Sequence, residues 1–351
     1  MKKKIMFFAN HASFFISHRL NIYEEVKKKK YDFFLIIGKS SSKKMEKIAL
    51  KKLNQLKIPF TILNFNSYNF NLINDIKSII KLFILIKKFK PDVFHSVAPK
   101  PNLYGGLVSL FLPINKTVIS LSGMGFLFTG NLSFLNFIKK ILYLICLKLI
   151  FLKKNLTVIV QNKDDYKYLV DEFKIAKKIK LIKGGSGIKL EKFSKIKRHK
   201  NKNIVFSARL VKSKGIIEFI KAAKILKKQF PKWNFLIFGA DDYKSHDSFN
   251  INEFKELVEK KIIIIKGYET NIVKILKNTE IFCLPTHREG FPKSVMEASA
   301  AGIPCIVSDA IGSKESIVNN KTGLLFKNRD YKDLIKKLKF LISNPKKRVF
   351  F

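Results

Sequence analysis

The chain has 351 residues, of which 47% are hydrophobic, and its formal net charge is +43 at pH 7. This length predicts two domains, and the apolar content excludes a wholly disordered chain. The lysines are spread over every segment, and no RNA-binding signature is present. We therefore attribute the positive charge to a biased composition and to attraction to an anionic membrane surface, and we expect no specific nucleic-acid partner.

Strand-like and helix-like stretches alternate through the first half of the chain. Such alternation, with apolar strands, is typical of a parallel sheet covered on both faces. The predicted strands are 4–9, 32–37, 60–65, 92–95, 116–121 and 156–161, and the predicted helices are 18–28, 41–56, 73–90, 102–111, 134–152 and 163–172.

Two apolar segments of this half partly resemble membrane signals. Residues 1–8 are basic and then apolar, like the start of a signal peptide, but Asn10 and His11 interrupt the apolar stretch too early. In segment 134–152, three lysines leave no run of about 18 uncharged apolar residues, the usual requirement for spanning a bilayer. We expect a buried first strand and a packed or surface-lying helix.

The alternation begins again in the second half. Its predicted strands are 203–207, 233–238, 262–265, 280–284 and 304–307, and its predicted helices are 214–229, 252–260, 270–277, 292–301, 313–318 and 330–342. Glycines followed by charged residues mark 186–202 as a linker. The sequence therefore predicts two doubly wound α/β domains, 1–185 and 203–351, facing a cleft, with ligands bound beyond the carboxyl ends of the strands.

The cysteines and the last residues add little to this picture. Cys146, Cys283 and Cys305 are far apart in apolar runs, so we expect reduced thiols in a cytosolic compartment and neither disulfides nor a metal pair. The chain closes on S-N-P-K-K-R-V-F-F, and Phe350 and Phe351 have no obvious core to enter.

The most informative block is residues 288–307, R-E-G-F-P-K-S-V-M-E-A-S-A-A-G-I-P-C-I-V. Glu289 and Glu297 stand eight positions apart, and Pro292 lies where a helix is expected to begin, a position that favours proline. The following amides would be free donors at the positive end of the helix, which suits a phosphate. An anion-binding helix start beside two carboxylates suits a sugar diphosphate.

With this block inside two such domains, the chain resembles the retaining nucleotide-sugar glycosyltransferases of family four, which have the two-Rossmann GT-B fold. It is most similar to the bacterial enzymes of surface-polysaccharide and lipid-linked glycan assembly, over nearly its whole length. The resemblance implies a hexosyltransferase that moves a sugar, with retention, from a nucleotide diphosphate sugar, expected to be UDP-linked. The implied acceptor is a hydroxyl of a glycan or of a polyprenyl-diphosphate-linked sugar.

The resemblance also implies a donor site in the second domain. The family's E-x7-E pattern makes Glu289 the catalytic candidate that contacts the donor sugar and Glu297 the ligand of the ribose. The motif S-A-R-L-V-K-S-K-G places Arg209 and Lys214 on the diphosphate, whose growing negative charge must be stabilised. The remaining donor-side candidates are Gly239, Tyr268, Gly290, Phe291, Pro292 and Lys293.

The first domain is expected to bind the acceptor. His95, in P-D-V-F-H, matches a family histidine and is the second catalytic candidate, while the family's histidine near Ser122 is missing. The acceptor-side candidates are Asn10, His18, Arg19, Lys100, Gly123 and Gly125.

Further expectations follow from the same resemblance. No metal or other cofactor is expected, because the fold generally needs none and no Asp-x-Asp motif is present. Segments 76–90 and 134–154 are apolar and basic, which suits a peripheral enzyme on the inner face of the cytoplasmic membrane. The final helix that crosses back in this fold is expected to be missing, so the second domain is expected to be truncated.

Other functions remain compatible with the sequence. A nucleotide-sugar epimerase of the same fold would release an epimer or a free sugar without any acceptor. A phosphorylase would carry a pyridoxal-phosphate lysine motif, which the sequence lacks. A non-catalytic basic protein would bind nucleic acid or anionic membranes, would do so after Glu289→Ala, and would turn over no nucleotide sugar.

Overall fold

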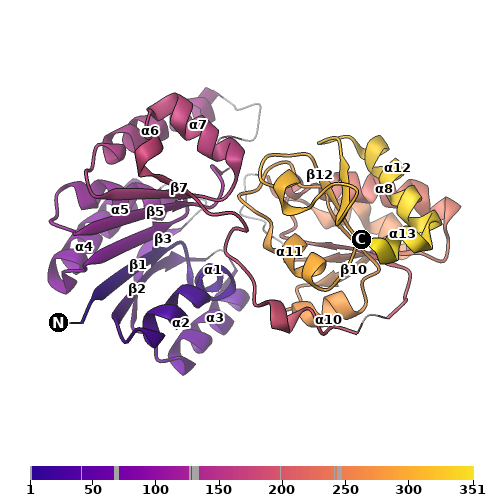
Figure 1. The fold of residues 1–351 in the computed structure, drawn as a ribbon, viewed down its shortest axis with the longest axis horizontal. Coiled ribbons are helices and arrows are strands. Elements are labelled where there is room, and N and C mark those ends of the chain that lie inside the picture. Colours follow the sequence, from indigo (N-terminus) through magenta and orange to yellow (C-terminus); the bar gives the residue numbers. More distant parts are fainter. Residues whose placement is uncertain are drawn as a thin grey trace. The chain divides into compact units, whose positions relative to one another are not determined.

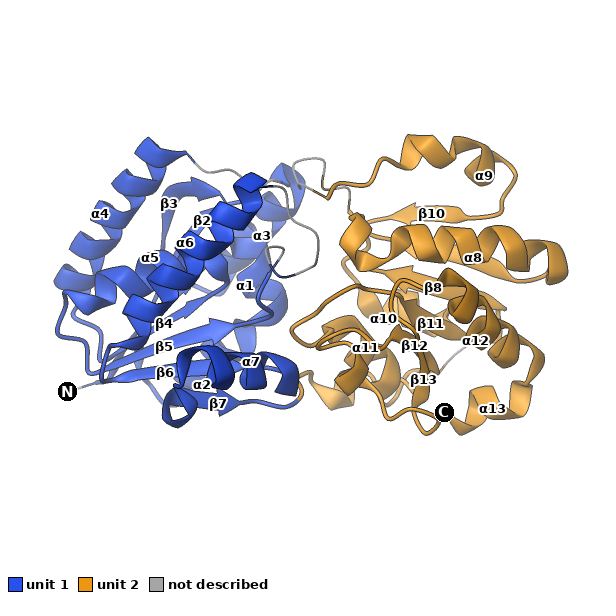
Figure 2. Cartoon of the chain, turned by 90° about the horizontal axis from the view of Figure 1, so that it is seen from above, with its two compact units in different colours: residues 1–183 blue, residues 184–351 orange. Residues whose placement is uncertain are grey.

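The computed structural model describes residues 2–40, 42–66, 71–125, 128, 134–197, 199–240, 242 and 247–351. The chain forms two compact units, unit 1 (Met1–Lys183) and unit 2 (Gly184–Phe351), coloured separately in Figure 2. Each unit is an α/β domain with its own parallel sheet and its own apolar core.

Unit 1 contains a sheet of seven parallel strands in the order β3-β2-β1-β4-β5-β6-β7 (Figure 1). Its strands are β1 (Lys4–Ala9), β2 (Asp32–Lys39), β3 (Phe60–Asn66), β4 (Val93–Val97), β5 (Lys116–Leu121), β6 (Leu156–Val160) and β7 (Ile179–Leu181). Its α-helices are α1 (Ala12–His18), α2 (Leu20–Lys28), α3 (Lys43–Gln55), α4 (Leu72–Phe89), α5 (Pro99–Leu110), α6 (Phe134–Phe151) and α7 (Lys163–Phe173).

The two faces of this sheet are covered by different helices because successive strand residues point to opposite sides. Phe7 packs with Phe15 and Phe33 in the core beneath α1, α2 and α3. The next residue, Phe8, packs with Phe65 and Phe94 in the core beneath α4 and α5. The apolar strands of the sequence are therefore buried on both faces, as the alternation predicts.

The predicted helix 18–28 is wrong at its start, where the structure has two helices separated at Arg19. The first of them, α1, begins at Ala12 because His11 Nδ1 accepts the amide of Phe14, at 3.2 Å. Glu46 of α3 accepts the amides of Ala12 and Ser13, at 2.8 and 3.1 Å. This carboxylate caps the helix from 34 positions away, so no local sequence pattern reveals it.

Unit 2 repeats the topology with a six-stranded parallel sheet in the order β10-β9-β8-β11-β12-β13. Its strands are β8 (Asn203–Ser207), β9 (Asn234–Phe238), β10 (Ile264–Gly267), β11 (Ile281–Leu284), β12 (Cys305–Ser308) and β13 (Gly323–Phe326). Its α-helices are α8 (Ile216–Gln229), α9 (Lys255–Glu259), α10 (Ile272–Lys277), α11 (Lys293–Ala300), α12 (Tyr331–Ser343) and α13 (Pro345–Phe350).

In each sheet the order of the strands reverses at one point, the switch point. It lies between β1 and β4 in unit 1 and between β8 and β11 in unit 2. The loops that follow these strand pairs diverge to opposite faces and leave room for a ligand beyond the carboxyl ends. The prediction of two doubly wound α/β domains is confirmed. The short strands β7 and β13 and the helix α13 are additions that the sequence pattern did not predict.

The whole stretch predicted as a linker, 186–202, belongs to unit 2. Phe193 follows a short 3-10 helix, Leu190–Lys192, and is buried in the core of unit 2. A single apolar residue among charged residues is too weak a pattern to predict this packing from the sequence. The same core contains Cys283 and Cys305 as buried free thiols, while Cys146 is a half-buried free thiol in unit 1.

Within the described ranges, no helix combines the length and the apolar content needed to cross a bilayer.

The last residues pack better than the sequence suggests. Phe350 is exposed, but Phe351 contacts the core of unit 2, so the expectation that neither has a core is wrong for Phe351. Arg348 of α13 donates to the carbonyl oxygens of Leu341 and Ile342 at the end of α12. Its guanidinium also pairs with Glu280, at 3.0 Å, and lies over the ring of Trp233, at 5.1 Å.

Replacing Arg348 should therefore destabilise unit 2. Arg348→Ala leaves the partly buried carboxylate of Glu280 and two helix-end carbonyls without this donor, and we expect a loss of about 2 kcal/mol in the free energy of unfolding. Urea denaturation measures the loss, with Lys346→Ala on the exposed side of the same helix as the control. Equal midpoints for the two variants would show that these contacts contribute nothing.

Candidate active site

In unit 2 the loops after β8 and β11 meet at the switch point of the sheet. We call them the 209–215 turn and the 285–292 loop. Gly215 ends the turn with φ of 76°, and a Cβ atom there would lie 1.9 Å from the carbonyl oxygen of Pro285. Only glycine allows this approach, because the backbone of the facing loop cannot give way. The close contact explains why the lysine motif ends in glycine.

This contact brings Lys214 and Glu289 together, although they are 75 positions apart in the chain. Lys214 Nζ lies 2.5 Å from Glu289 Oε1, and both side chains are largely buried. The amide of Glu289 donates to the carbonyl of Ile311, at 2.9 Å, and Gly312 packs against the Glu289 carbonyl with no room for a Cβ atom. The predicted sugar-binding carboxylate and the predicted phosphate-binding ammonium thus form one ion pair on a rigid backbone.

The helix beside this pair, α11, begins one residue later than predicted. Pro292 precedes it in an extended conformation, with φ of −74° and ψ of 107°, and Lys293 is the first helical residue. The prediction that Pro292 is the first helical residue is therefore wrong. The first-turn amides of a helix have no partner within the helix, so the start of α11 still presents donors next to Gly290 and Phe291.

Glu297 lies inside α11 and is only 9% exposed, so it is not on a solvated helix face. Lys293 Nζ lies 3.5 Å from its Oε1. Burial raises the pKa of the Glu297 carboxyl above its ordinary value of 4.5, and Lys293 offsets only part of this effect. A buried carboxylate whose charge is costly to maintain is typical of a ligand-binding position.

Arg209 follows β8 and is anchored by a residue that the sequence analysis did not single out. Its Nη1 lies 2.9 Å from Asp242 Oδ2, and 52% of its side chain is exposed while that of Asp242 is buried. Asp242 lies four residues after the end of β9, and only the tertiary contact reveals its partner. The carboxylate holds the guanidinium at the switch point and leaves part of it open to a ligand.

The two weaker donor-side candidates lie further along the sheet. A Cβ atom at Gly239, just after β9, would lie 2.1 Å from the carbonyl oxygen of Ala208, so this glycine permits close packing of the loops after β8 and β9. Tyr268 follows β10, the edge strand, and its side chain is partly exposed. The structure therefore groups Arg209, Lys214 and Glu289 at the switch point and places Tyr268 two strands away.

In unit 1, His95 lies on β4 at the corresponding switch point. Its Nε2 lies 2.7 Å from Ser120 Oγ on β5, and its ring packs against Phe7, with 4.6 Å between ring centroids. Burial, together with the nearby charge of Arg19, lowers the pKa of His95 to about 3. The imidazole is therefore neutral at physiological pH, which suits a hydrogen-bonding role and not that of a cationic acid.

Arg19 is the most unusual acceptor-side candidate. It is only 5% exposed, its Nη1 donates to the carbonyl of His18 at 2.9 Å, and its guanidinium lies over the ring of Phe14 at 5.4 Å. Burial lowers the pKa of Arg19 to about 10. Among the described residues it forms no ion pair with a carboxylate, so its charge is available to an anion. His18 stacks on the same Phe14 ring, at 5.1 Å.

Lys100, by contrast, is committed to a buried ion pair. Its Nζ lies 3.1 and 3.2 Å from the two carboxylate oxygens of Asp75, which ties α5 to α4. Burial lowers the pKa of Lys100, and Asp75 partly compensates for this effect. The geometry favours a structural role over the predicted contact with an acceptor phosphate.

Among the described residues of unit 1, Gly123, Gly125 and Ala98 have positive φ near the switch point. Gly123 and Gly125, after β5, have φ of 95° and 83°, as a glycine loop requires. Ala98, between β4 and α5, has φ of 82° and ψ of 158°, a region that side chains rarely adopt. No local sequence pattern indicates this strain. Asn10, at the end of β1, has a buried Oδ1 without a hydrogen-bond partner among the described residues.

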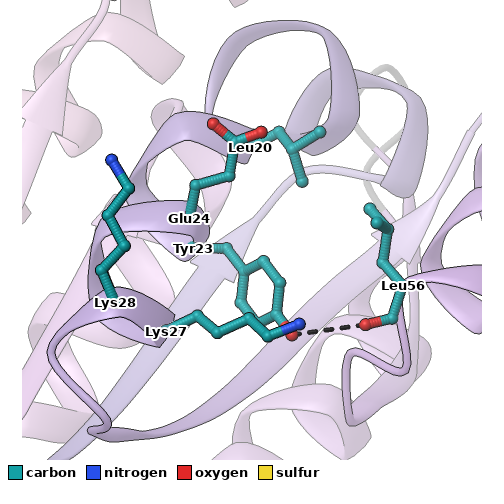
Figure 3. A pocket seen from close by; sticks show the side chains of 6 residues that line it. All are labelled: Leu20, Tyr23, Glu24, Lys27, Lys28 and Leu56. Atoms are coloured by element: carbon teal, nitrogen blue, oxygen red, sulfur yellow. Dashed lines mark hydrogen bonds between the residues drawn. The ribbon is translucent and has the colours of Figure 1, made fainter.

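The structure also contains a hollow outside this site. It has a volume of about 410 Å³, lies against α2 in unit 1, and is mostly apolar (Figure 3). Its lining residues are Leu20, Tyr23, Glu24, Lys27, Lys28 and Leu56. None of the predicted site residues lines it. In the described ranges, no cluster of three or more His, Cys, Asp or Glu side chains could hold a metal ion.

Comparison with known proteins agrees with this architecture. The family described as "Glycosyl transferases group 1" matches residues 187–351, and the family described as "Glycosyl transferase 4-like" matches residues 4–162. The N,N'-diacetylbacillosaminyl-diphospho-undecaprenol alpha-1,3-N-acetylgalactosaminyltransferase of Campylobacter jejuni is 30% identical, over 97% of this chain and 90% of its own. The UDP-Gal:alpha-D-GlcNAc-diphosphoundecaprenol alpha-1,3-galactosyltransferase of Escherichia coli is 29% identical, over 77% of this chain and 71% of its own.

A solved structure of HepE from Anabaena, in complex with UDP and glucose, has the same fold, with a TM-score of 0.76 at 15% identity over 99% of this chain and 92% of that chain. Two Rossmann-like units of this topology define a glycosyltransferase of the GT-B fold. The chain belongs to the glycosyltransferases of the group 1 and 4-like family. It is an enzyme of the hexosyltransferase type.

The raised pKa of Glu297 makes stability depend on pH in a predictable direction. The folded state binds the carboxyl proton more tightly than the unfolded chain, so ionisation of Glu297 costs stability as the pH rises through 4.5 to its raised pKa. We expect Glu297→Gln to stabilise the protein at pH 8 and to have little effect at pH 4. Denaturation at the two pH values checks this, with exposed Glu259→Gln as the control. An equal effect of Glu297→Gln at both pH values would contradict the prediction.

Proposed function

We propose that the protein transfers a sugar, with retention, from a UDP-linked donor to a hydroxyl of a polyprenyl-diphosphate-linked sugar or glycan during synthesis of cell-surface polysaccharide. The observation that carries this proposal is the Lys214–Glu289 pair beside the start of α11. The printed names of the two bacterial relatives support it, because both give a diphospho-undecaprenol acceptor and an alpha-1,3 product. An α-linked product formed from an α-linked nucleotide sugar corresponds to retention.

The charges of unit 2 suit a leaving nucleotide diphosphate. As the bond between the anomeric carbon and the phosphate oxygen breaks, negative charge grows on the diphosphate. Arg209, oriented by Asp242, and Lys214, oriented by Glu289, can neutralise it together with the amides of α11. We assign this neutralisation to the cationic side chains and propose that no metal ion is required. When a phosphate of the donor pairs with Lys214, the ion pair with Glu289 would break, and the Glu289 carboxylate could then bind the donor sugar.

Front-face substitution accounts for retention with these groups. The acceptor oxygen bonds to the anomeric carbon on the face that the leaving phosphate departs from, and the phosphate oxygen takes the proton of the acceptor hydroxyl. Glu289 would orient the donor sugar, and Glu297 would bind the ribose of the nucleotide. In unit 1, Arg19 offers a buried positive charge to the anionic acceptor, and neutral His95 offers a hydrogen bond.

We also propose that unit 1 binds the anionic inner face of the cytoplasmic membrane through α4 and α6. Both helices lie on the sheet face opposite α1, α2 and α3, with α5 in contact with each of them. They expose an unusual number of apolar side chains: Leu72, Ile73, Ile76, Ile80 and Ile84 on α4, and Phe134, Leu135, Phe137, Ile138, Ile141, Leu142, Ile145 and Leu149 on α6. Lysines flank these rows, including exposed Lys77, Lys81 and Lys148. Apolar rows with basic flanks suit the interface of an anionic bilayer.

The donor site is tested by nucleotide binding. Arg209→Ala and Glu297→Ala should each weaken the affinity for UDP about tenfold or more, because each removes a charged hydrogen-bonding group from the nucleotide. Titration calorimetry measures the affinity, and Lys255→Ala on exposed α9 should leave it unchanged. If both site variants bind UDP as tightly as the wild type does, the donor site lies elsewhere.

Turnover separates the proposed reaction from its alternatives. A screen of nucleotide sugars with membrane extracts should give one lipid-linked product. Release of an epimer or a free sugar without an acceptor would indicate an epimerase instead. Binding to nucleic acid that survives Glu289→Ala, with no turnover of any donor, would indicate a non-catalytic basic protein.

The membrane surface is tested by vesicle sedimentation. The double substitution Leu142→Glu with Ile145→Glu should weaken binding to phosphatidylglycerol vesicles at least about tenfold, because it removes two inserting side chains and adds negative charge. Both side chains are exposed, so the fold should be retained. Val318→Glu, at an exposed apolar position of unit 2, is the control for the addition of a negative charge outside this face. Undiminished binding by the double variant would exclude this face of α6.

A further inference from the structure

One carboxylate of unit 2, that of Glu218, takes no part in the proposed chemistry. It lies in the first turn of α8, and its Oε1 is 2.9 Å from His287 Nε2. Both side chains are largely buried, and Glu218 Oε2 is buried without a hydrogen-bond partner among the described residues. Burying a carboxylate oxygen in this way costs free energy, which other favourable contacts of the fold must offset.

The pair closes a set of contacts between the 209–215 turn and the 285–292 loop. The amide of His287 donates to the carbonyl oxygen of Ser213, at 2.9 Å, and Thr286 Oγ1 donates to the same oxygen, at 3.1 Å. The carbonyl of His287 in turn accepts a hydrogen bond from Asn328 Nδ2, at 3.3 Å. His287 is therefore held to the turn and α8 on one side and to the loop after β13 on the other.

The residues joined in this way are the immediate neighbours of the donor groups. Ser213 precedes Lys214, and His287 lies two positions before Glu289. A hydrogen bond between a ring nitrogen and a carboxylate is directional and strong, so it restrains the loop more than an apolar contact of the same size would. Displacement of a substrate-positioning group by about 1 Å can reduce a rate about 100-fold.

We propose that Glu218 is a positioning residue for sugar transfer. Through His287 it holds the backbone that carries Glu289 at a set distance from the turn that carries Lys214. The inference rests on the proposed function of these two residues. It assigns to Glu218 and His287 no contact with the donor, so their loss affects the rate of transfer more than the binding of the nucleotide.

The test compares four variants in steady-state transfer: Glu218→Ala, Glu218→Gln, His287→Ala and the double variant Glu218→Ala with His287→Ala. Glu218→Ala should lower kcat about 10- to 100-fold and change the KM for the donor less than about threefold. Glu218→Gln keeps an oxygen that accepts from Nε2–H and should restore most of kcat. Glu259→Ala, an exposed glutamate on α9, makes the same change of charge and should leave kcat unaltered.

The double variant shows whether the two residues act as one unit. If they do, it should be no slower than the slower single variant, because the second substitution removes a group whose partner is already gone. If the losses of kcat in the two single variants multiplied in the double variant, the two residues would act independently, and this result would overturn the proposal. So would a kcat for Glu218→Ala within twofold of the wild type, or a loss of kcat that follows the loss of folded protein in the same preparation.

A readout that needs no turnover separates this inference from the proposed function. Amide hydrogen exchange of residues 286–291 should be faster in Glu218→Ala, should return towards the wild-type rate in Glu218→Gln, and should stay unchanged in the strands β8 and β9. Failure of the wild type to use any nucleotide sugar would overturn the proposed function. Unchanged exchange of residues 286–291 in Glu218→Ala would overturn the role of Glu218, whatever the outcome for turnover.

Discussion

The close approach of two backbones at the switch point of unit 2 is the constraint on which its site depends. Gly215 lies so near the carbonyl of Pro285 that no Cβ atom fits between them. Because the 209–215 turn and the 285–292 loop touch here, a lysine and a glutamate from distant parts of the chain meet at 2.5 Å. Gly312 supports Glu289 from the other side in the same way. Steric limits on glycine positions thus place the charges of the site.

The two units share a topology but differ in the chemistry at their switch points. Unit 2 has paired charges, with Arg209 held by Asp242 and Lys214 by Glu289. Unit 1 has a buried arginine and a neutral histidine, with a strained backbone at Ala98. Paired cations can exchange their carboxylates for phosphates, which suits repeated binding and release of a nucleotide. Under the proposed function, the buried arginine of unit 1 would instead bind an anion in a poorly solvated site.

Much of the fold and part of the site could be predicted from the sequence. Apolar runs and amphipathic helices predicted nearly every long element, because burial on both faces of a parallel sheet leaves a strong pattern. Short elements such as β7 and β13 leave too few residues for such a pattern. The break at Arg19 was missed because Glu46, from another helix, caps α1. Lys100 was expected at a ligand because nothing in its motif reveals the buried carboxylate of Asp75.

By itself, the sequence determined the two α/β domains, the family, and the residue types that a sugar diphosphate requires. These follow from local pattern and from motif spacing, which can be recognised without knowing which residues are in contact. Only the tertiary structure decided which groups meet. It paired Lys214 with Glu289, Arg209 with Asp242, and His287 with Glu218. The physical reason is that strand order, and not chain order, sets the neighbours at the carboxyl edge of a parallel sheet, and strand order depends on how the whole chain packs.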